Sequence, residues 1–137
     1  VLFTGCATDT FYGRDKETEG TSTTRTGVRY LLGRGVPQDN AKAYSYFLQA
    51  AKADDPFAQN EVAFLYAAGK GTRRDDKQAF YWYQKAANHG LVSAQYNLGL
   101  LYLHGVGTPV NKALAKEWID KAAVKGFAPA RQAKVRV

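Results

Sequence analysis

The sequence repeats itself at an interval of 36 residues (66 − 30 and 102 − 66), seen first in Tyr30, Tyr66 and Tyr102. Three residues after each tyrosine comes a Gly-x-Gly pair, namely Gly33 and Gly35, Gly69 and Gly71, and Gly105 and Gly107. The same interval aligns Ala43, Ala79 and Ala115, the aromatic residues Tyr46, Trp82 and Trp118, and the pairs Ala50-Ala51, Ala86-Ala87 and Ala122-Ala123. A fixed period of this length is typical of a solenoid of stacked structural units, which offers an extended binding surface.

Each unit is predicted to contain two helices. In the last full unit, Ala94, Leu98, Leu101 and Tyr102 recur at helical spacing, which predicts a helix over residues 93–104. Gly105 and Gly107 are predicted to end this helix, because glycine adopts the left-handed backbone of a helix stop. A second helix follows, with Asn111 as its N-cap, and Asp75 is the predicted N-cap at the same place in the middle unit.

Two strings carry a family resemblance: Ala94-Gln-Tyr-Asn-Leu-Gly-Leu-Leu-Tyr-Leu-His-Gly-Val-Gly107 and Ala115-Lys-Glu-Trp-Ile-Asp-Lys-Ala-Ala-Val-Lys-Gly126. Both closely resemble the Sel1-like repeat, a longer relative of the tetratricopeptide repeat. The resemblance implies an all-α, right-handed solenoid of about three helix-turn-helix repeats. These would span about residues 26–54, 55–90 and 91–126, with a terminal cap at 127–137. The pattern is weaker in the first repeat, where Arg29 replaces the leucine seen at Leu65 and Leu101.

Residues 1–25 precede the predicted repeats. They begin with a short apolar run that ends in Thr4-Gly5-Cys6, which resembles the lipobox of bacterial lipoproteins. The resemblance implies that Cys6 is lipidated and anchors the protein to the outer membrane, with the polar stretch that follows acting as a tether. Phe3 departs from this pattern, because leucine usually occupies its position. The alternative is a chain end in which Cys6 is an incidental free cysteine.

The chain is basic, with a formal net charge of +7. From Asn111 onward, seven Lys and Arg residues face only Glu117 and Asp120. Such a bias is compatible with nucleic acid, an anionic membrane or an acidic protein. No nucleic-acid-binding module is recognisable, and the aromatic residues follow the repeat columns rather than the charges. The pattern therefore favours a solvated face or an acidic protein partner, and we expect no nucleic-acid ligand.

Few residues have the spacing that a metal site, a phosphate loop or a catalytic site requires. His89 and His104 lie in different predicted helices, with no second ligand at metal-binding spacing. The Gly-x-Gly pairs follow helices rather than strands, and no Lys-Ser/Thr closes them, so they are not phosphate loops. Paired aspartates such as Asp75-Asp76 are explained by helix capping. The sequence therefore predicts a protein that is not an enzyme and has no catalytic residue, metal site or cofactor.

A partner is expected on the first helix of each repeat, by analogy with tetratricopeptide repeats. In the third repeat the residues on that side are Tyr96, Leu100, Leu103 and His104, and in the second they include Asn60 and Phe64. Several are apolar where a solvated groove would be polar, which is a mark of a binding surface. The alternative is that these side chains pack against adjacent helices.

Together, these features predict a non-catalytic protein-binding module in the bacterial periplasm, anchored to the membrane through Cys6. The most specific version is an immunity lipoprotein that inhibits a toxic effector delivered by type VI secretion, such as a lipase. Two alternatives stay open: a scaffold or regulatory adaptor of an envelope assembly, and an accessory to a cell-wall or polysaccharide enzyme.

Overall fold

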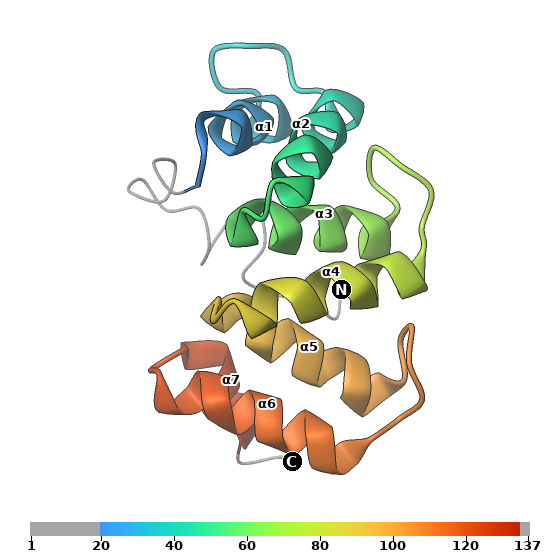
Figure 1. The fold of residues 1–137 in the computed structure, drawn as a ribbon, viewed down its shortest axis with the longest axis vertical. Coiled ribbons are helices and arrows are strands. Elements are labelled where there is room, and N and C mark those ends of the chain that lie inside the picture. The colour runs from blue at the N-terminus through green and yellow to red at the C-terminus, as the bar shows by residue number, and fades with distance from the viewer. Residues whose placement is uncertain (1–19, 135–137) are drawn as a thin grey trace.

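The computed structural model describes residues 20–134, and this part of the chain is entirely helical (Figure 1). Cys6 and most of the predicted tether lie outside the described residues, as does the end of the predicted cap. The helices are α1 (Ser22–Leu32), α2 (Asn40–Lys52), α3 (Pro56–Ala68), α4 (Asp76–Asn88), α5 (Val92–His104), α6 (Lys112–Val124) and α7 (Ala128–Lys134). The all-α solenoid expected from the sequence is confirmed.

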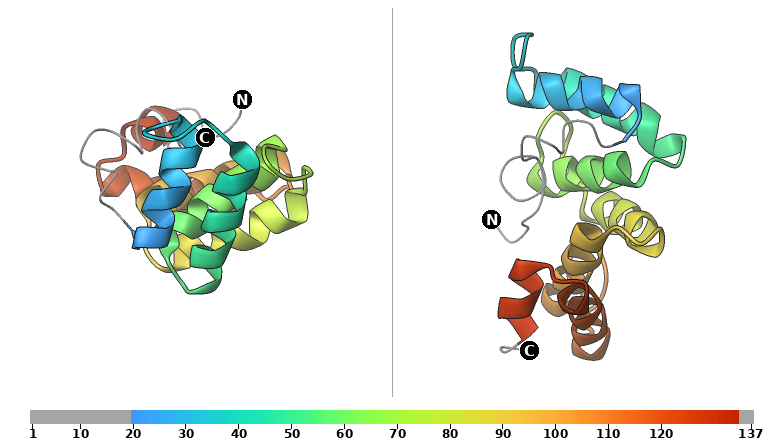
Figure 2. Two further views of the ribbon diagram at one scale, coloured as in Figure 1. Left: turned by 90° about the horizontal axis from the view of Figure 1, so that it is seen from above. Right: turned by 90° about the vertical axis from the view of Figure 1, so that its left-hand side faces the viewer.

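Successive helices stack in chain order along one axis. Pairs α1–α2, α3–α4 and α5–α6 form the three hairpins, and each hairpin packs on the next through α2–α3 and α4–α5. Figures 1 and 2 show the layers following one another from α1 and α2 at one end to α6 and α7, which lie side by side, at the other. We call the first helix of each hairpin (α1, α3, α5) helix A and the second (α2, α4, α6) helix B.

The turn between helices A and B is built by the first glycine of each Gly-x-Gly pair. Gly33, Gly69 and Gly105 have φ angles of 69°, 66° and 68°, and each amide donates to a carbonyl of the last helical turn. These are left-handed C-caps, which glycine adopts without the steric cost that a side chain brings. The predicted positions of the turns around Gly69 and Gly105 are confirmed.

The second glycine joins one repeat to the preceding one. A Cβ placed on Gly71 would lie 2.2 Å from the carbonyl oxygen of Asn40, and one on Gly107 would lie 2.2 Å from that of Asp76. Asn40 and Asp76 are the first residues of α2 and α4. Each turn therefore rests on the start of the preceding helix B, at a distance that excludes a side chain.

Helix B begins in the same way in all three repeats. The side chains of Asp39, Asp75 and Asn111 accept hydrogen bonds from the backbone N–H groups of Lys42, Gln78 and Leu114. Each bond satisfies an amide that the first helical turn would leave unpaired. The predicted N-caps Asp75 and Asn111 are therefore confirmed.

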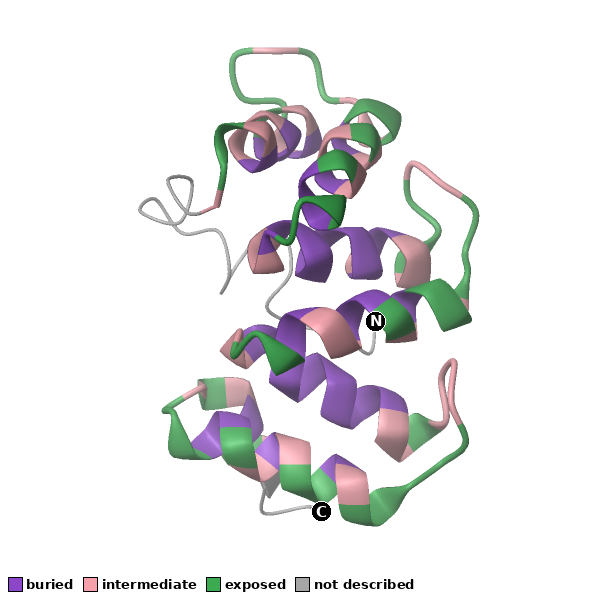
Figure 3. Cartoon of the chain, in the orientation of Figure 1, coloured by how far each residue is buried: buried purple, intermediate pink, exposed green. Residues whose placement is uncertain are grey.

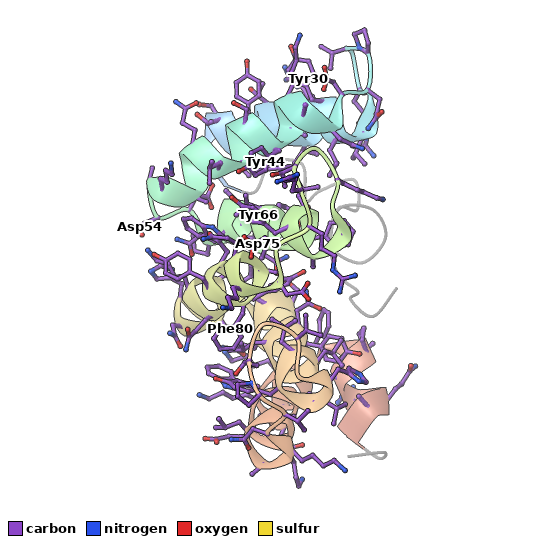
Figure 4. All side chains as sticks on the ribbon, turned by 90° about the vertical axis from the view of Figure 1, so that its right-hand side faces the viewer. Tyr30, Tyr44, Asp54, Tyr66, Asp75 and Phe80 are labelled. Carbon is purple, nitrogen blue, oxygen red and sulfur yellow. The ribbon has the colours of Figure 1, made fainter. Side chains whose placement is uncertain are left out.

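Aromatic pairs fill the space between layers. Tyr44 of α2 meets Tyr66 of α3 edge-to-face, with ring centroids 5.5 Å apart and ring planes at 85° (Figure 4). One repeat later, Phe80 of α4 meets Tyr102 of α5 with the same separation and angle. The two joints thus have matching geometry, as expected where a repeated sequence builds a repeated contact.

The first helix starts earlier than the sequence indicated. Residues 22–25 were expected in the tether, but they form the first turn of α1, with Thr21 as its N-cap. The reason is a tertiary contact with the buried Asp55, whose carboxylate accepts hydrogen bonds from the Thr21 backbone and from the Thr24 hydroxyl. Asp55 also caps α3 by accepting from Phe57 N, so one carboxylate holds the starts of two helices A.

Burial is greatest in the middle of the stack. Figure 3 shows α3 and α5 buried along most of their length, whereas α2, α4 and α6 are exposed along one side. Leu65 and Leu101 are fully buried, while Arg29 at the same repeat position is exposed. No helix among the described residues precedes α1, so Arg29 occupies a polar end of the stack.

Candidate partner-binding face

The sequence predicts six partner-binding residues on helix A. Asn60 and Phe64 lie on α3, and Tyr96, Leu100, Leu103 and His104 lie on α5. The structure divides them into two groups. Three of them are buried, and the other three, near the C-terminal ends of the helices, are partly or fully exposed.

Tyr96 and Leu100 are core residues. Only 8% and 6% of their surfaces are exposed, because they pack in a cluster with Ile119 of α6 and with residues at the start of α7. The Phe127 ring lies 5.5 Å from that of Tyr96, centroid to centroid. The expectation of an exposed patch is therefore wrong for these two residues. The sequence indicated a polar cap over 127–137, whereas Phe127, Ala130 and Ala133 pack in the cluster with Tyr96 and Leu100 of α5.

Asn60 is fully buried as well, so it is not on the surface. Neither its amide nitrogen nor its carbonyl oxygen has a hydrogen-bond partner. At the same repeat position, Thr24 is also fully buried but donates its hydroxyl to Asp55. A buried amide without a hydrogen-bond partner is unfavourable by roughly 1–3 kcal/mol, so no packing or hydrogen-bonding role explains the choice of asparagine at this position.

Phe64 is the aromatic residue of the helix A face that stays partly exposed. Val28 and Leu100 occupy the same position in the neighbouring repeats, and only 2% and 6% of their surfaces are exposed. The ammonium group of Lys70 lies 5.7 Å from the centroid of the Phe64 ring. A cation over the ring face adds a modest attraction and places a positive charge beside an apolar surface.

Leu103 and His104 complete the accessible group. Leu103 is partly buried and His104 is exposed, and both lie in the last turn of α5 before Gly105. The accessible residues of the predicted set are therefore Phe64 of α3 and Leu103 and His104 of α5; Phe64 packs against one core cluster and Leu103 against the other. We call Phe64, Leu103 and His104 the helix A rim.

Two glutamines join successive layers, a role that the sequence did not lead us to expect. Gln59 Nε2 donates to Ala51 O over 3.2 Å, and Gln95 Nε2 donates to Ala87 O over 3.3 Å. The spacing of Gln59 and Gln95 is one repeat (95 − 59), and this was the available signal. Because the acceptors are carbonyls near helix ends, the glutamines satisfy groups that the helices leave unpaired.

The same glutamines accept a hydrogen bond from the residues that follow the next helix B. Lys125 Nζ donates to Gln95 Oε1 over 3.4 Å, and His89 Nδ1 lies 3.1 Å from Gln59 Oε1. Gln59 already donates through Nε2, so its Oε1 accepts and His89 Nδ1 carries the proton in this contact. His89 therefore helps to hold Gln59, which in turn connects α3 to α2.

Two side chains near the turn between α3 and α4, those of Tyr66 and Arg74, have raised pKa values. The Tyr66 and Tyr44 hydroxyls lie 2.7 Å apart, and burial together with this hydrogen bond raises the pKa of Tyr66 to about 12. Arg74 donates to both carboxylate oxygens of Asp76, over 3.0 and 3.3 Å, which raises the pKa of the guanidinium. Asp76 is thereby neutralised by its own loop.

The described residues contain no cluster of three or more His, Cys, Asp or Glu side chains that could hold a metal ion. Within the same part of the chain, no helix is both long enough and apolar enough to span a membrane.

Comparison with protein families gives one clear result. A family model described as the Sel1 repeat matches residues 22–55, 56–91 and 92–127. None of the curated proteins compared with this chain matched it.

Solved structures show the same architecture. A Sel1 repeat protein from Oxalobacter formigenes is 36% identical, with a TM-score of 0.76, over 84% of this chain and 86% of that one. A protective antigen present in uropathogenic Escherichia coli strains is 34% identical, with a TM-score of 0.77, over 79% of this chain. This chain covers only 23% of that antigen's length. Cysteine-rich protein B of Helicobacter pylori, 24% identical, shares the fold with a TM-score of 0.64 over 69% of this chain and 72% of that one.

Proposed function

The chain belongs to the Sel1 repeat family, and on that premise we propose that it binds a protein partner through the helix A rim. Sel1 repeats are generally non-catalytic scaffolds for protein–protein interaction, so protein binding is the role of the module. The proposal concerns where the partner binds and what kind of protein it is.

One observation carries the choice of surface. Phe64 is the largest side chain at its repeat position, and it stays partly exposed where Val28 and Leu100 are buried. Phe64 packs against the core cluster with part of its ring, and the part that stays exposed is unfavourable in water unless a partner covers it. Aromatic anchors of this kind dominate the binding energy of protein interfaces.

For the cellular role we propose an envelope lipoprotein, anchored through Cys6, that inhibits a toxic secreted effector. Thr4-Gly5-Cys6 supports the anchor through its resemblance to a lipobox. An immunity protein needs a compact, non-catalytic binding surface, which this fold supplies.

The binding proposal is tested with a protein that this chain captures from an envelope extract and that mass spectrometry identifies. Isothermal titration calorimetry compares wild type with Phe64→Ala and Leu103→Ala. Losing an anchor that contributes about 2 kcal/mol should weaken binding by tens-fold. Tyr81→Ala is the matched control, because Tyr81 is 48% exposed but lies on helix B of the same repeat. Equal losses for Phe64→Ala and Tyr81→Ala would contradict the proposed surface.

Partner type and anchoring have separate readouts. Neutralisation of the effector in a co-expression assay supports immunity, whereas stable binding without neutralisation supports an adaptor role. Enhanced turnover by a cell-wall or polysaccharide enzyme would instead support the accessory role.

Metabolic labelling of the full-length protein with an alkyne-tagged palmitate tests the anchor, and Cys6→Ser should abolish the label. Equal labelling of both proteins would end the lipoprotein proposal.

A further inference from the structure

The turn between α3 and α4 carries a group of basic side chains that the other two turns lack. Lys70, Arg73 and Lys77 are all exposed. One repeat later, the same positions hold Val106, Pro109 and Ala113, and one repeat earlier they hold Arg34, Pro37 and Ala41. We call Lys70, Arg73 and Lys77 the basic loop.

The repeats act as internal controls for what the fold needs. The turn at Gly105 has the same C-cap as that at Gly69, and Gly107 contacts Asp76 O as Gly71 contacts Asn40 O. In the third repeat this geometry forms with Val, Pro and Ala at the positions of the basic loop. The charges of the middle repeat are therefore not required to build the turn.

Nearby acidic residues compensate these charges only in part. Asp76 is paired with Arg74, and Asp75 keeps its negative charge while it caps α4 by accepting from Gln78 N, so residues 70–77 hold four basic and two acidic side chains. Within residues 20–134, no carboxylate lies within ion-pair distance of Lys70, Arg73 or Lys77. Like charges on one turn repel one another, so the net charge of +2 (4 − 2) on residues 70–77 favours a partner that supplies opposite charge.

The basic loop is also held in place. Backbone bonds from Lys70 N to Leu65 O and from Asp75 N to Tyr66 O tie both ends of the turn to α3, and Gly71 rests on α2. Lys70 extends over Phe64, so the basic loop adjoins the helix A rim. Charges on a fixed backbone lose less entropy on binding than charges on a mobile one.

We propose that the basic loop binds an acidic segment of the protein partner. Carboxylates of that segment would face Lys70, Arg73 and Lys77 while apolar side chains contact Phe64. The proposal rests on the proposed function and specifies the chemistry of the partner, which should carry Asp or Glu beside an apolar anchor.

The test uses fluorescence anisotropy of a short, fluorescein-labelled, glutamate-rich peptide at low and physiological salt. Wild type is compared with K70Q/R73Q/K77Q and with a control triple, R29Q/K42Q/K52Q, which removes the same charge from exposed residues of the first repeat. A second loop variant, K70V/R73P/K77A, carries the residues that the third repeat has at these positions. Because the same turn forms with those residues in the third repeat, this variant should keep the fold. Circular dichroism and melting must match wild type in each variant.

Both loop variants should weaken peptide binding about tenfold, since three exposed charge contacts are lost, and the control triple should change it less than about twofold. Equal losses in the loop and control variants would overturn the proposal, as would an absence of peptide binding at low salt. Tighter, loop-dependent binding to phosphatidylglycerol vesicles or to duplex DNA would also overturn it, by assigning a different class of partner. Loop variants that bind normally while Phe64→Ala does not would refute this inference alone and leave the helix A rim intact.

Discussion

Two separate requirements, a positive φ and the absence of a Cβ, act on the second glycine of the Gly-x-Gly turns. The backbone requirement is the same in the three repeats, because φ is positive, between 70° and 74°, at Gly35, Gly71 and Gly107. The requirement for no Cβ arises only where a preceding helix B packs against the turn. A Cβ placed on Gly35 would have nothing within 4 Å, so this glycine meets the first requirement alone.

Substitution of these glycines separates the two requirements. Gly35→Ala should cost about 1–2 kcal/mol, the usual penalty for a side chain in the left-handed region. Gly71→Ala should cost clearly more, because its Cβ would lie 2.2 Å from Asn40 O and force the layers apart. Urea unfolding of the two variants measures the difference. Equal losses would mean that the contact between turn and helix does not restrict this position.

The contribution of Tyr66 to the stability of the fold depends on pH. Its folded-state pKa of about 12 lies above the ordinary value of 10.0, so folding favours the protonated, neutral phenol. The resulting stability is fully present below pH of about 10 and is lost as the pH rises toward 12.

We therefore expect the unfolding free energy of wild type to fall between pH of about 10 and 12, and to fall less steeply in Tyr66→Phe. Tyr44→Phe is the companion variant, because Phe80 occupies the same position in the next repeat and packs on Tyr102 without a second hydroxyl. If the unfolding free energies of wild type and Tyr66→Phe fall in parallel as the pH rises, a group other than Tyr66 causes the loss of stability.

At the scale of elements, α7 determines what α5 can expose. It packs against α6, and the apolar residues at its start close the cluster that contains Tyr96 and Leu100. This seven-residue helix is too short to be stable alone, so it is held by packing. The boundary between core and surface on α5 therefore depends on a neighbouring element.

Phe127→Ala should lower the unfolding free energy by about 1–3 kcal/mol, since a partly buried ring is lost from this cluster. It should also increase the fluorescence of a hydrophobic dye such as ANS, because Tyr96 and Leu100 become accessible. Tyr81→Ala, which truncates a ring that is 48% exposed, controls for the loss of an aromatic residue. If both variants match wild type, α7 does not cover α5 in solution.

The whole molecule is a one-dimensional stack. Each helix contacts the helices adjacent to it in sequence, so the helices from α2 to α6 each pack against two neighbours, whereas α1 and α7 each pack mainly against one. In such arrays, stability is the sum of repeat and nearest-neighbour terms, and the ends open first.

Native-state hydrogen exchange should reflect this order. Backbone amides of α3 and α5, which are the most buried, should exchange slowest, and those of α1 and α7 should exchange at lower opening free energies. Mass spectrometry of peptides from each helix gives the profile. Uniform protection from α1 to α7 would indicate one cooperative unit instead of a stack with separable ends.

The sequence by itself determined the period, the helices and the turns of this protein. These features are set by local rules, in which glycine after a helical run ends it and Asp or Asn before one begins it, and repetition at 36 residues (102 − 66) made the signals reinforce each other. Only the tertiary structure decided which helix A residues stay accessible. Tyr96, Leu100 and Phe64 all matched the same expectation, yet the α7 segment covers the first two and leaves Phe64 partly exposed. Burial depends on what packs across from a residue, and that partner is distant from it in sequence.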